Sequence, residues 1–339
     1  MLQGEQSWIF ERKPVIVSTA TVVGPEEGKG PIAGDFDIIH EDMMLEESSW
    51  EKAERKMMEE AARLAVKKGN LSKGQVEFYV GGDLMNQIIS SSFAARELSI
   101  PYIGVFGACS TSMESLALAA LMVNSGAANT VLAGTCSHNC SAEKQFRYPT
   151  EYGSQKPPTA QFTVTGAAAS IVRAGGVGPV VTSATIGKVL DLGITDPFNM
   201  GAAMAPAAVN TIQAHLKDLN RDPSYYDLIV TGDLATVGKD IALELFQEKN
   251  ISMASTVFDD CGLMIFDRET QSVQSGGSGC ACSGVVTYAH LLKKMKEGEL
   301  RKILVVATGA LLSPVSYQQG ESIPCIAHAV SIEHKGGTT

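Results

Sequence analysis

Hydrophobic positions along the chain follow two spacings. Short β-branched runs such as Val15–Val23 predict strands, and segments in which apolar residues recur every three or four positions predict helices. Trp50–Lys68 is a clear helix, with Ser48/Ser49 suited to cap its start and Gly69-Asn70 suited to end it. The same criteria predict further strands and helices before residue 175: strands 76–81, 102–106, 130–135 and 162–173, and helices 86–98 and 110–124.

The rest of the chain repeats this alternation. The predicted elements are strands 180–185, 228–231, 302–307 and 326–333, and helices 201–217, 236–248 and 282–296. Strands that alternate with helices are typical of a largely parallel sheet covered on both faces. The pattern therefore places the chain in the α/β class.

Internal similarity shows that the two parts are copies of one unit. Phe78-Tyr-Val-Gly-Gly-Asp-Leu84 returns as Leu228-Ile-Val-Thr-Gly-Asp-Leu234, and Gly107-Ala-Cys-Ser110 is echoed by Gly279-Cys-Ala-Cys282. Two more matches occur in the same order: 17–21 with 181–185, and 167–171 with 328–332. Four ordered matches predict a duplicated fold.

The duplication predicts a five-layer α-β-α-β-α sandwich. Helices 110–124 and 282–296, one from each copy, form its central layer, because the first is apolar nearly all round. We divide the chain into a first half, 10–175, a second half, 176–334, and a flexible tail, 335–339. The first half carries a long insertion at 136–160.

Composition narrows the possible partners. The 339 residues carry a formal charge of −10 and contain no cluster of lysine and arginine. The sequence therefore offers no basic surface that would attract nucleic acid or anionic lipid. No signal peptide precedes the seven cysteines, so reduced thiols are expected. The longest apolar stretch, 115–134, is interrupted by polar residues and glycine and is not a membrane-spanning helix. Thirty-three glycines are many for this length, and they cluster at predicted strand-to-helix turns.

The sequence around Cys109 is the segment most typical of a reactive site. Strand 102–106 runs into Gly107-Ala108, then Cys109, and a helix starts at Ser110. A thiol at a helix N-terminus is favoured as thiolate, and the same amides suit an oxyanion or a carboxylate. The alternative is a small buried cysteine at a tight turn.

The duplicated halves, with a cysteine at the turn into the central helix of the first half, resemble the thiolase and β-ketoacyl synthase superfamily. The resemblance covers about residues 10–334 and implies a thiolase-like fold in which Cys109 matches the acylated cysteine. Ketosynthase-type enzymes need His with His or Asn from the second half. This chain reads Gly232-Asp233 at the first position and has neither residue type in 276–282 at the second.

Thiolases carry a second catalytic cysteine in a Cys-Ile-Gly-Gly-Gly stretch. Cys325-Ile-Ala-His-Ala329 resembles only its start. Because loss of one such partner typically costs about 10²–10³ in rate, we expect a non-catalytic protein whose pocket survives as a binding site. The alternative is an acyl-transfer enzyme that uses Cys109.

Several segments resemble the stage V sporulation protein AD family. They are 136–153, 159–166, 24–31 with 34–37, and 232–238. The resemblance implies binding of dipicolinic acid (pyridine-2,6-dicarboxylic acid) or its calcium chelate, in uptake during sporulation and release at germination. It implies a peripheral place at the forespore or spore inner membrane, with membrane subunits of the same operon as partners, and no cofactor. Thiolase-fold proteins are usually dimers through an edge strand, which we assign to 130–135.

The candidate ligand-binding residues lie around the predicted pocket. They are Cys109, Ser110, Asp83, Asp233, His138, Arg147, Tyr148, Lys156 and Ser278. Amides at the two helix starts, beside Cys109 and at 279–282, are expected to converge on the ligand's charge. Arg147, Tyr148 and Lys156 lie on the insertion, which closes over the pocket or forms a dimer arm.

The two Gly-Asp-Leu segments leave a choice open. Asp83 and Asp233 either face the metal of a calcium chelate or cap the helix that follows them. Cys136-x-His138-x-Cys140 has no common zinc-finger spacing and no second ligand pair, so we expect no metal site there. His138 instead lines the pocket or satisfies a loop.

Overall fold

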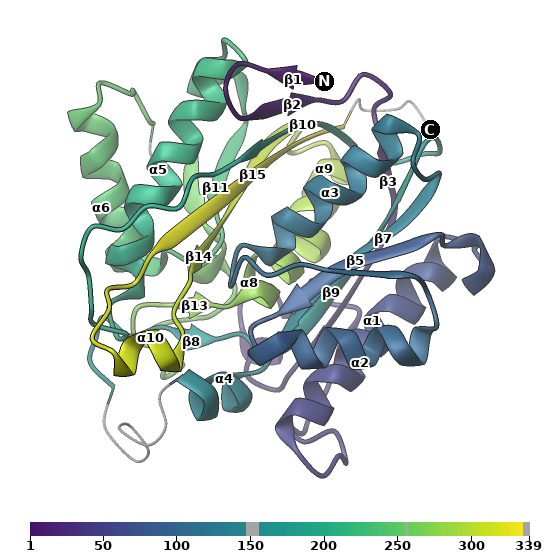
Figure 1. The fold of residues 1–339 in the computed structure, drawn as a ribbon, viewed down its shortest axis with the longest axis horizontal. Helices are drawn as coiled ribbons and strands as arrows, with labels where there is room; N and C mark the ends of the chain where they lie inside the picture. Colours follow the sequence, from purple (N-terminus) through teal and green to yellow (C-terminus); the bar gives the residue numbers. More distant parts are fainter. Residues whose placement is uncertain (147–155, 255–256, 335–339) are drawn as a thin grey trace.

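The computed structural model describes residues 1–146, 156–254 and 257–334 (Figure 1). The long path of its main sheet is made of two sets of five strands each. The strand order is β12-β11-β14-β15-β10-β3-β9-β7-β5-β6. The first five-strand set is β3 (Val15–Val23), β5 (Phe78–Asp83), β6 (Tyr102–Gly104), β7 (Thr130–Ser137) and β9 (Gly166–Arg173). The second set is β10 (Val180–Ile186), β11 (Leu228–Thr231), β12 (Phe258–Asp260), β14 (Lys302–Ala310) and β15 (Cys325–Glu333). The sets meet where Val15 pairs with Val180. From that point outward the strands follow in equivalent order, β3-β9-β7-β5-β6 and β10-β15-β14-β11-β12, which confirms the duplication.

Helices form three layers around these strands. In Figure 1, α1 (Trp50–Lys68) and α2 (Ile89–Leu98) lie on the opposite side of the molecule from α5 (Met200–Asp218) and α6 (Ala235–Glu248). Between them lie α3 (Thr111–Ser125) and a helix built of α8 (Cys280–Val285), the π-helical turn η6 (Val286–Leu291) and α9 (Leu292–Glu297). Strands of both sets contact α3. This arrangement confirms the five-layer sandwich.

The central helix shows why the chain folds this way. Met113, Leu116, Ala117 and Ala120 of α3 are completely buried. A helix that is buried along most of its length needs apolar residues around nearly its whole circumference, as the sequence supplies here. The apolar stretch 115–134 is divided between α3, which ends at Ser125, and the strand β7. No helix in the described ranges is both long and apolar enough to cross a membrane.

Smaller elements complete the fold. They are β1 (Leu2–Gln3), β2 (Ser7–Ile9), β4 (Ile38–Ile39), β8 (Phe162–Thr163), β13 (Gly277–Ser278), α4 (Asn139–Phe146), α7 (Cys261–Met264), α10 (Pro314–Gln318) and the 3₁₀ turns η1 (Glu27–Lys29), η2 (Ala33–Asp35), η3 (Lys73–Gln75), η4 (Asn86–Ile88) and η5 (Pro223–Tyr225). The sequence patterns missed β12 and the β1–β2 ribbon, because runs of two or three residues carry no measurable periodicity.

Two sequence predictions are corrected. The segment 130–135 is not at an edge, because β7 lies between β5 and β9, and the sheet ends at β6 and β12. The predicted helix 86–98 is interrupted, because Gln87 and Ile88 adopt left-handed backbone angles and α2 starts only at Ile89. The tail 335–339 lies outside the described residues.

Candidate functional site

Cys109 lies in a constrained turn at the start of α3. Ala108, directly before it, has a φ of 51°, in the left-handed region that non-glycine residues seldom adopt. The turn packs tightly against the end of β14, where a Cβ on Gly309 would lie 2.1 Å from the Gly107 carbonyl oxygen. Only glycine at position 309 allows this approach. The turn holds Cys109 at the meeting point of the two halves.

Asp233 is the neighbour of Cys109 from the second half. Its carboxylate accepts the Gly279 N–H, with 3.3 Å between N and Oδ2, and a short hydrogen bond from the Thr308 hydroxyl. The Cys109 thiol lies beside the same carboxyl group. Asp233 therefore brings a buried carboxyl group from the second half next to the thiol of the first.

Electrostatics keep the Cys109 thiol neutral. Burial raises its pKa most, and the adjacent Asp233 carboxylate raises it further, whereas the Gly279 N–H opposes the shift. Burial also raises the pKa of Asp233 to about 7, although the Thr308 hydroxyl and the Cys109 thiol stabilise its charged form. The expectation that the helix start favours a thiolate is wrong, because desolvation and the adjacent carboxyl group outweigh the helix dipole.

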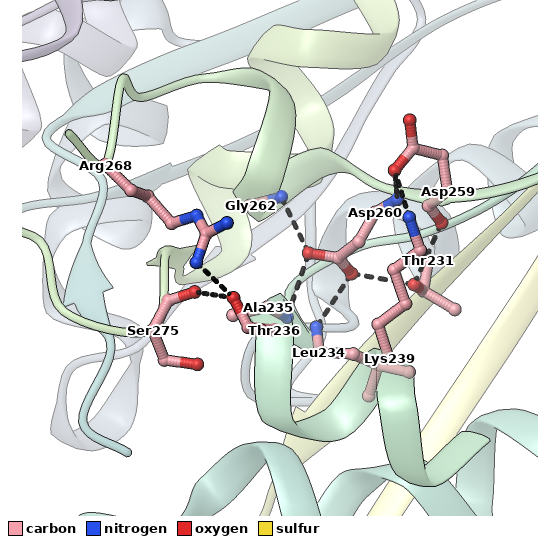
Figure 2. A network of polar contacts seen from close by, with 10 residues as sticks. All are labelled: Thr231, Leu234, Ala235, Thr236, Lys239, Asp259, Asp260, Gly262, Arg268 and Ser275. Atoms are coloured by element: carbon pink, nitrogen blue, oxygen red, sulfur yellow. Dashed lines mark hydrogen bonds and ion pairs between the residues drawn. The ribbon is translucent and has the colours of Figure 1, made fainter. Parts of the chain in front are cut away.

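Asp260 holds the turn that carries Asp233 (Figure 2). Its Oδ2 accepts the Thr231 hydroxyl at 2.7 Å and the Leu234 N–H at 2.8 Å. Its Oδ1 accepts the N–H groups of Ala235 and Gly262, each at 2.9 Å. Four donors to one buried carboxylate fix the path from β11 into α6 and with it the position of Asp233.

Asp83, the equivalent of Asp233 in the first half, has a different role. Its Oδ1 accepts the Met85 N–H at 2.8 Å and its Oδ2 the Ser91 N–H at 2.7 Å. Burial raises its pKa to about 6, against these two N–H donors. Asp83 is completely buried and does not line the cavity described below, so the structure shows the helix-capping arrangement.

A cavity of about 40 Å³ lies over Cys109. Its lining residues are Leu84, Phe106, Ala108, Cys109, Ala142, Glu143, Phe146, Thr163, Met200, Ser278, Ala310 and Leu312. A wider outer pocket of about 280 Å³ adjoins it and shares Leu84, Phe106, Phe146 and Leu312. The walls are largely apolar, and Glu143 is the only charged residue that the described chain contributes to either space.

The structure brings some predicted residues to this cavity. Ser278, from β13, lines it together with Cys109. Lys156 pairs with the lining residue Glu143, with 2.7 Å between Nζ and Oε1. Arg147 and Tyr148 lie outside the described residues.

Other predicted residues are engaged elsewhere. The Ser110 hydroxyl donates to the Gly107 carbonyl at 2.7 Å. His138 is buried with Nε2 2.9 Å from the Met43 carbonyl oxygen, and its Nδ1 accepts the Cys140 N–H at 3.1 Å. His138 thus satisfies a loop and does not line the cavity.

The helix-start amides that were expected to meet the ligand have partners within the protein. Asp233 accepts the Gly279 N–H, Ser137 Oγ accepts the Ala281 N–H at 3.2 Å, and the Gly107 carbonyl accepts the Ser110 N–H at 3.1 Å. These three amides are therefore not available to a bound anion.

Sequence reasoning missed several residues of the site. Thr163, Phe146 and Thr308 come from segments far apart in the chain, and no local motif marks them. The one local signal is Gly309 directly after Thr308, a glycine at a strand end that marks a close backbone approach.

Comparison with known proteins agrees with this geometry. The family model for stage V sporulation protein AD matches residues 4–333. Stage V sporulation protein AD of Bacillus subtilis strain 168 is 51% identical over 338 residues, which cover 100% of this chain and 99% of that protein.

Solved structures share the fold at low identity. The 3-oxoacyl-[acyl-carrier-protein] synthase III of Aquifex aeolicus is 16% identical with a TM-score of 0.58, covering 95% of this chain and 100% of that chain. Xanthomonas campestris OleA bound with cerulenin is 15% identical with a TM-score of 0.59, covering 96% and 98%. Human mitochondrial 3-ketoacyl-CoA thiolase is 12% identical with a TM-score of 0.58, covering 96% and 100%. The chain has a thiolase-like fold and belongs to the stage V sporulation protein AD family.

Proposed function

We propose that this protein is a non-catalytic binding protein for dipicolinic acid or its calcium chelate, acting in uptake during sporulation and release at germination. The observation that carries the proposal is the apolar cavity over a neutral Cys109 thiol. A thiol with a raised pKa is a weak nucleophile, because the thiolate is the reactive form. Family membership supports the choice of ligand and the step in sporulation.

The charges around the cavity favour the calcium chelate. Glu143 lines the cavity and pairs with Lys156, and no described lysine or arginine lines either space. Free dipicolinate is a dianion and would enter an apolar site of an acidic protein without compensation. A chelate of one Ca²⁺ with one dipicolinate is neutral and avoids this cost.

The size of the two spaces indicates where the ring binds. The inner cavity has room for about one or two water molecules, not for an aromatic ring. The outer pocket is wide enough for a ring, and it meets the inner cavity at Phe106 and Phe146. We therefore place the pyridine ring in the outer pocket with one carboxylate directed towards Cys109 and Ser278, after side-chain rotation of the two phenylalanines.

The proposed setting is peripheral at the forespore or spore inner membrane. Membrane subunits of the same operon are the proposed partners that dock the protein there. Membership of the sporulation protein family supports this setting.

Calorimetry tests the ligand directly. Calcium dipicolinate should bind the purified protein, with free dipicolinate weaker and calcium pyridine-3,5-dicarboxylate not binding. Cys109→Ala should weaken binding about tenfold through the lost sulfur contact, which corresponds to 1.4 kcal/mol, whereas Cys140→Ala should leave it unchanged. Equal binding of the two isomers would contradict the proposal.

The acyl-transfer alternative has its own readout. After incubation with acyl-CoA, mass spectrometry should show no acyl adduct on Cys109, because its thiol is neutral. A stable adduct on Cys109 would establish the enzyme alternative.

A further inference from the structure

A buried cluster of metal-binding side chains lies beneath the cavity. Glu54 from α1, Asp83 from the end of β5 and Cys136 from β7 each direct one donor atom to a common point, and these atoms lie within 4.8 Å of one another. All three side chains are completely buried. Three elements distant in the sequence thus bring two carboxyl groups and a thiol together.

The polar groups around this cluster make few close hydrogen bonds. Neither carboxylate oxygen of Glu54 has a hydrogen-bond partner. The buried hydroxyls of Ser90, Ser141 and Tyr79 also lack one. The Ser90 and Ser141 hydroxyls and the Cys136 thiol lie beside the Glu54 carboxyl group and stabilise its charged form, and Ser91 does the same for Tyr79. These contacts fall short of hydrogen-bond geometry at the Glu54 oxygens and at the Tyr79 hydroxyl. Buried polar groups normally have close hydrogen-bond partners, and a cation bound among these groups would supply the contacts that they make only poorly with one another.

The donor types indicate a cation. Two carboxyl groups at this distance repel each other once both are ionised, and a divalent ion removes that repulsion. A sulfur donor favours zinc-like ions over Ca²⁺ or Mg²⁺, which take oxygen ligands. Asp83 can serve even though both of its oxygens accept an N–H, because each oxygen has a second lone pair.

We propose that Glu54, Asp83 and Cys136 form an internal site for a zinc-class divalent ion, with water or a serine hydroxyl as fourth ligand. Two carboxylates, one thiolate and one neutral oxygen give four donors, each of a type that binds Zn²⁺. Of the Cys136-x-His138-x-Cys140 spacing the site uses Cys136 alone, because His138 contacts the Met43 carbonyl and Cys140 does not belong to the cluster.

The proposed ion lies directly behind the cavity wall. Asp83 precedes Leu84, and Ser141 precedes Ala142; both of these following residues line the cavity. The ion would therefore fix the wall on which α4 and the end of β5 meet, without contacting the bound ligand.

Metal analysis of the full-length protein tests the site without any dipicolinate. Chelator-treated protein, reloaded with Zn²⁺ and dialysed, should retain about one zinc per chain by mass spectrometry. Loading with Co²⁺ should give the near-ultraviolet absorption of a cobalt–thiolate bond. Glu54→Gln should lower the retained zinc at least tenfold, and Cys136→Ser should also abolish the thiolate band.

Matched variants control for folding and for unrelated thiols. Glu59→Gln changes a glutamate on the same helix that pairs with Arg55, and Cys140→Ser changes a partly buried cysteine nearby; both should retain the ion. Wild-type protein that retains less than a tenth of an equivalent of zinc, or that takes up Ca²⁺ instead, overturns the proposal. Equal loss of zinc in the control variants also overturns it.

Discussion

Cys109 and Asp233 control each other's protonation at the scale of single residues. The pKa of Asp233 is raised to about 7, so its carboxyl group ionises between pH 6 and 8, and the resulting charge opposes formation of the Cys109 thiolate. The neutral pair is therefore the stable form below about pH 7, and above it the negative charge resides on Asp233.

Asp233→Asn should make Cys109 more reactive. The amide keeps an acceptor for Thr308 but removes the negative charge, so the pKa of the thiol falls. We expect alkylation by iodoacetamide at pH 8 to be about tenfold faster, the effect of one pKa unit. Rates at Cys109 are measured by mass spectrometry across pH, with Cys140 as internal control. An unchanged or higher apparent pKa of Cys109 would refute the coupling.

Local sequence predicts some residues of the site and not others. The turn before α3 and the presence of Cys109 in it were predictable, because the strand, the small residues and the helix start are adjacent in the chain. The neighbour Asp233 was predictable only through the family resemblance. The raised pKa of the Cys109 thiol beside Asp233 was not predictable, because the burial of both groups depends on contacts between distant segments.

The two halves place their capping carboxylates on different elements. In the first half Asp83, at the end of β5, accepts the Ser91 N–H near the start of α2. In the second half Asp260, at the end of β12, accepts the N–H groups at the start of α6, which leaves Asp233 to face Cys109. The repeated Gly-Asp-Leu segment predicts that Asp83 and Asp233 occupy equivalent positions in the two halves. It does not predict that Asp260, on the neighbouring strand β12, caps the helix in the second half.

Asp260→Ala should destabilise the second half strongly. Three buried N–H groups and the Thr231 hydroxyl lose their acceptor, and we expect the free energy of unfolding to fall by about 2–4 kcal/mol. Urea denaturation followed by circular dichroism measures the change.

The neighbouring residue provides the control for this variant. Asp259→Ala removes a partly exposed ion pair with Lys239 and should cost less than about 1 kcal/mol. Similar losses for the two variants would mean that Asp260 does not hold the turn.

At the scale of the whole molecule, the main sheet ends at β6, whose outer edge pairs with no other strand of the described residues. Ile103 on β6 is 40% exposed, and Phe93 on the adjacent α2 is 46% exposed. An exposed edge with apolar neighbours is a template for pairing with another strand. We expect a homodimer formed by two copies of this edge, in place of the segment 130–135.

Ile103→Lys should convert that dimer into a monomer, because a buried lysine at the pairing edge is costly. Size-exclusion chromatography with light scattering measures the mass, and Val177→Lys, at a residue 92% exposed, serves as control. A wild-type monomer, or a dimer that survives Ile103→Lys, would rule out this interface.

At this scale the sequence predicted the layers and the duplication but not the strand neighbours. The repeats imply that both halves share one order, and the apolar helix implies the central layer. Which strand lies at the edge depends on pairing between distant segments, such as β3 with β9, where Val15 pairs with Arg173, and hydrophobic spacing carries no information about it.

The β1–β2 ribbon has a consequence for biosynthesis. Ser7–Ile9 pairs with β10, and Asp218 at the end of α5 accepts the N–H groups of Glu5 and Gln6. During translation these first residues leave the ribosome long before their partners exist. The ribbon therefore docks only after residue 218 has emerged, as a late step that fastens the start of the chain to the second half.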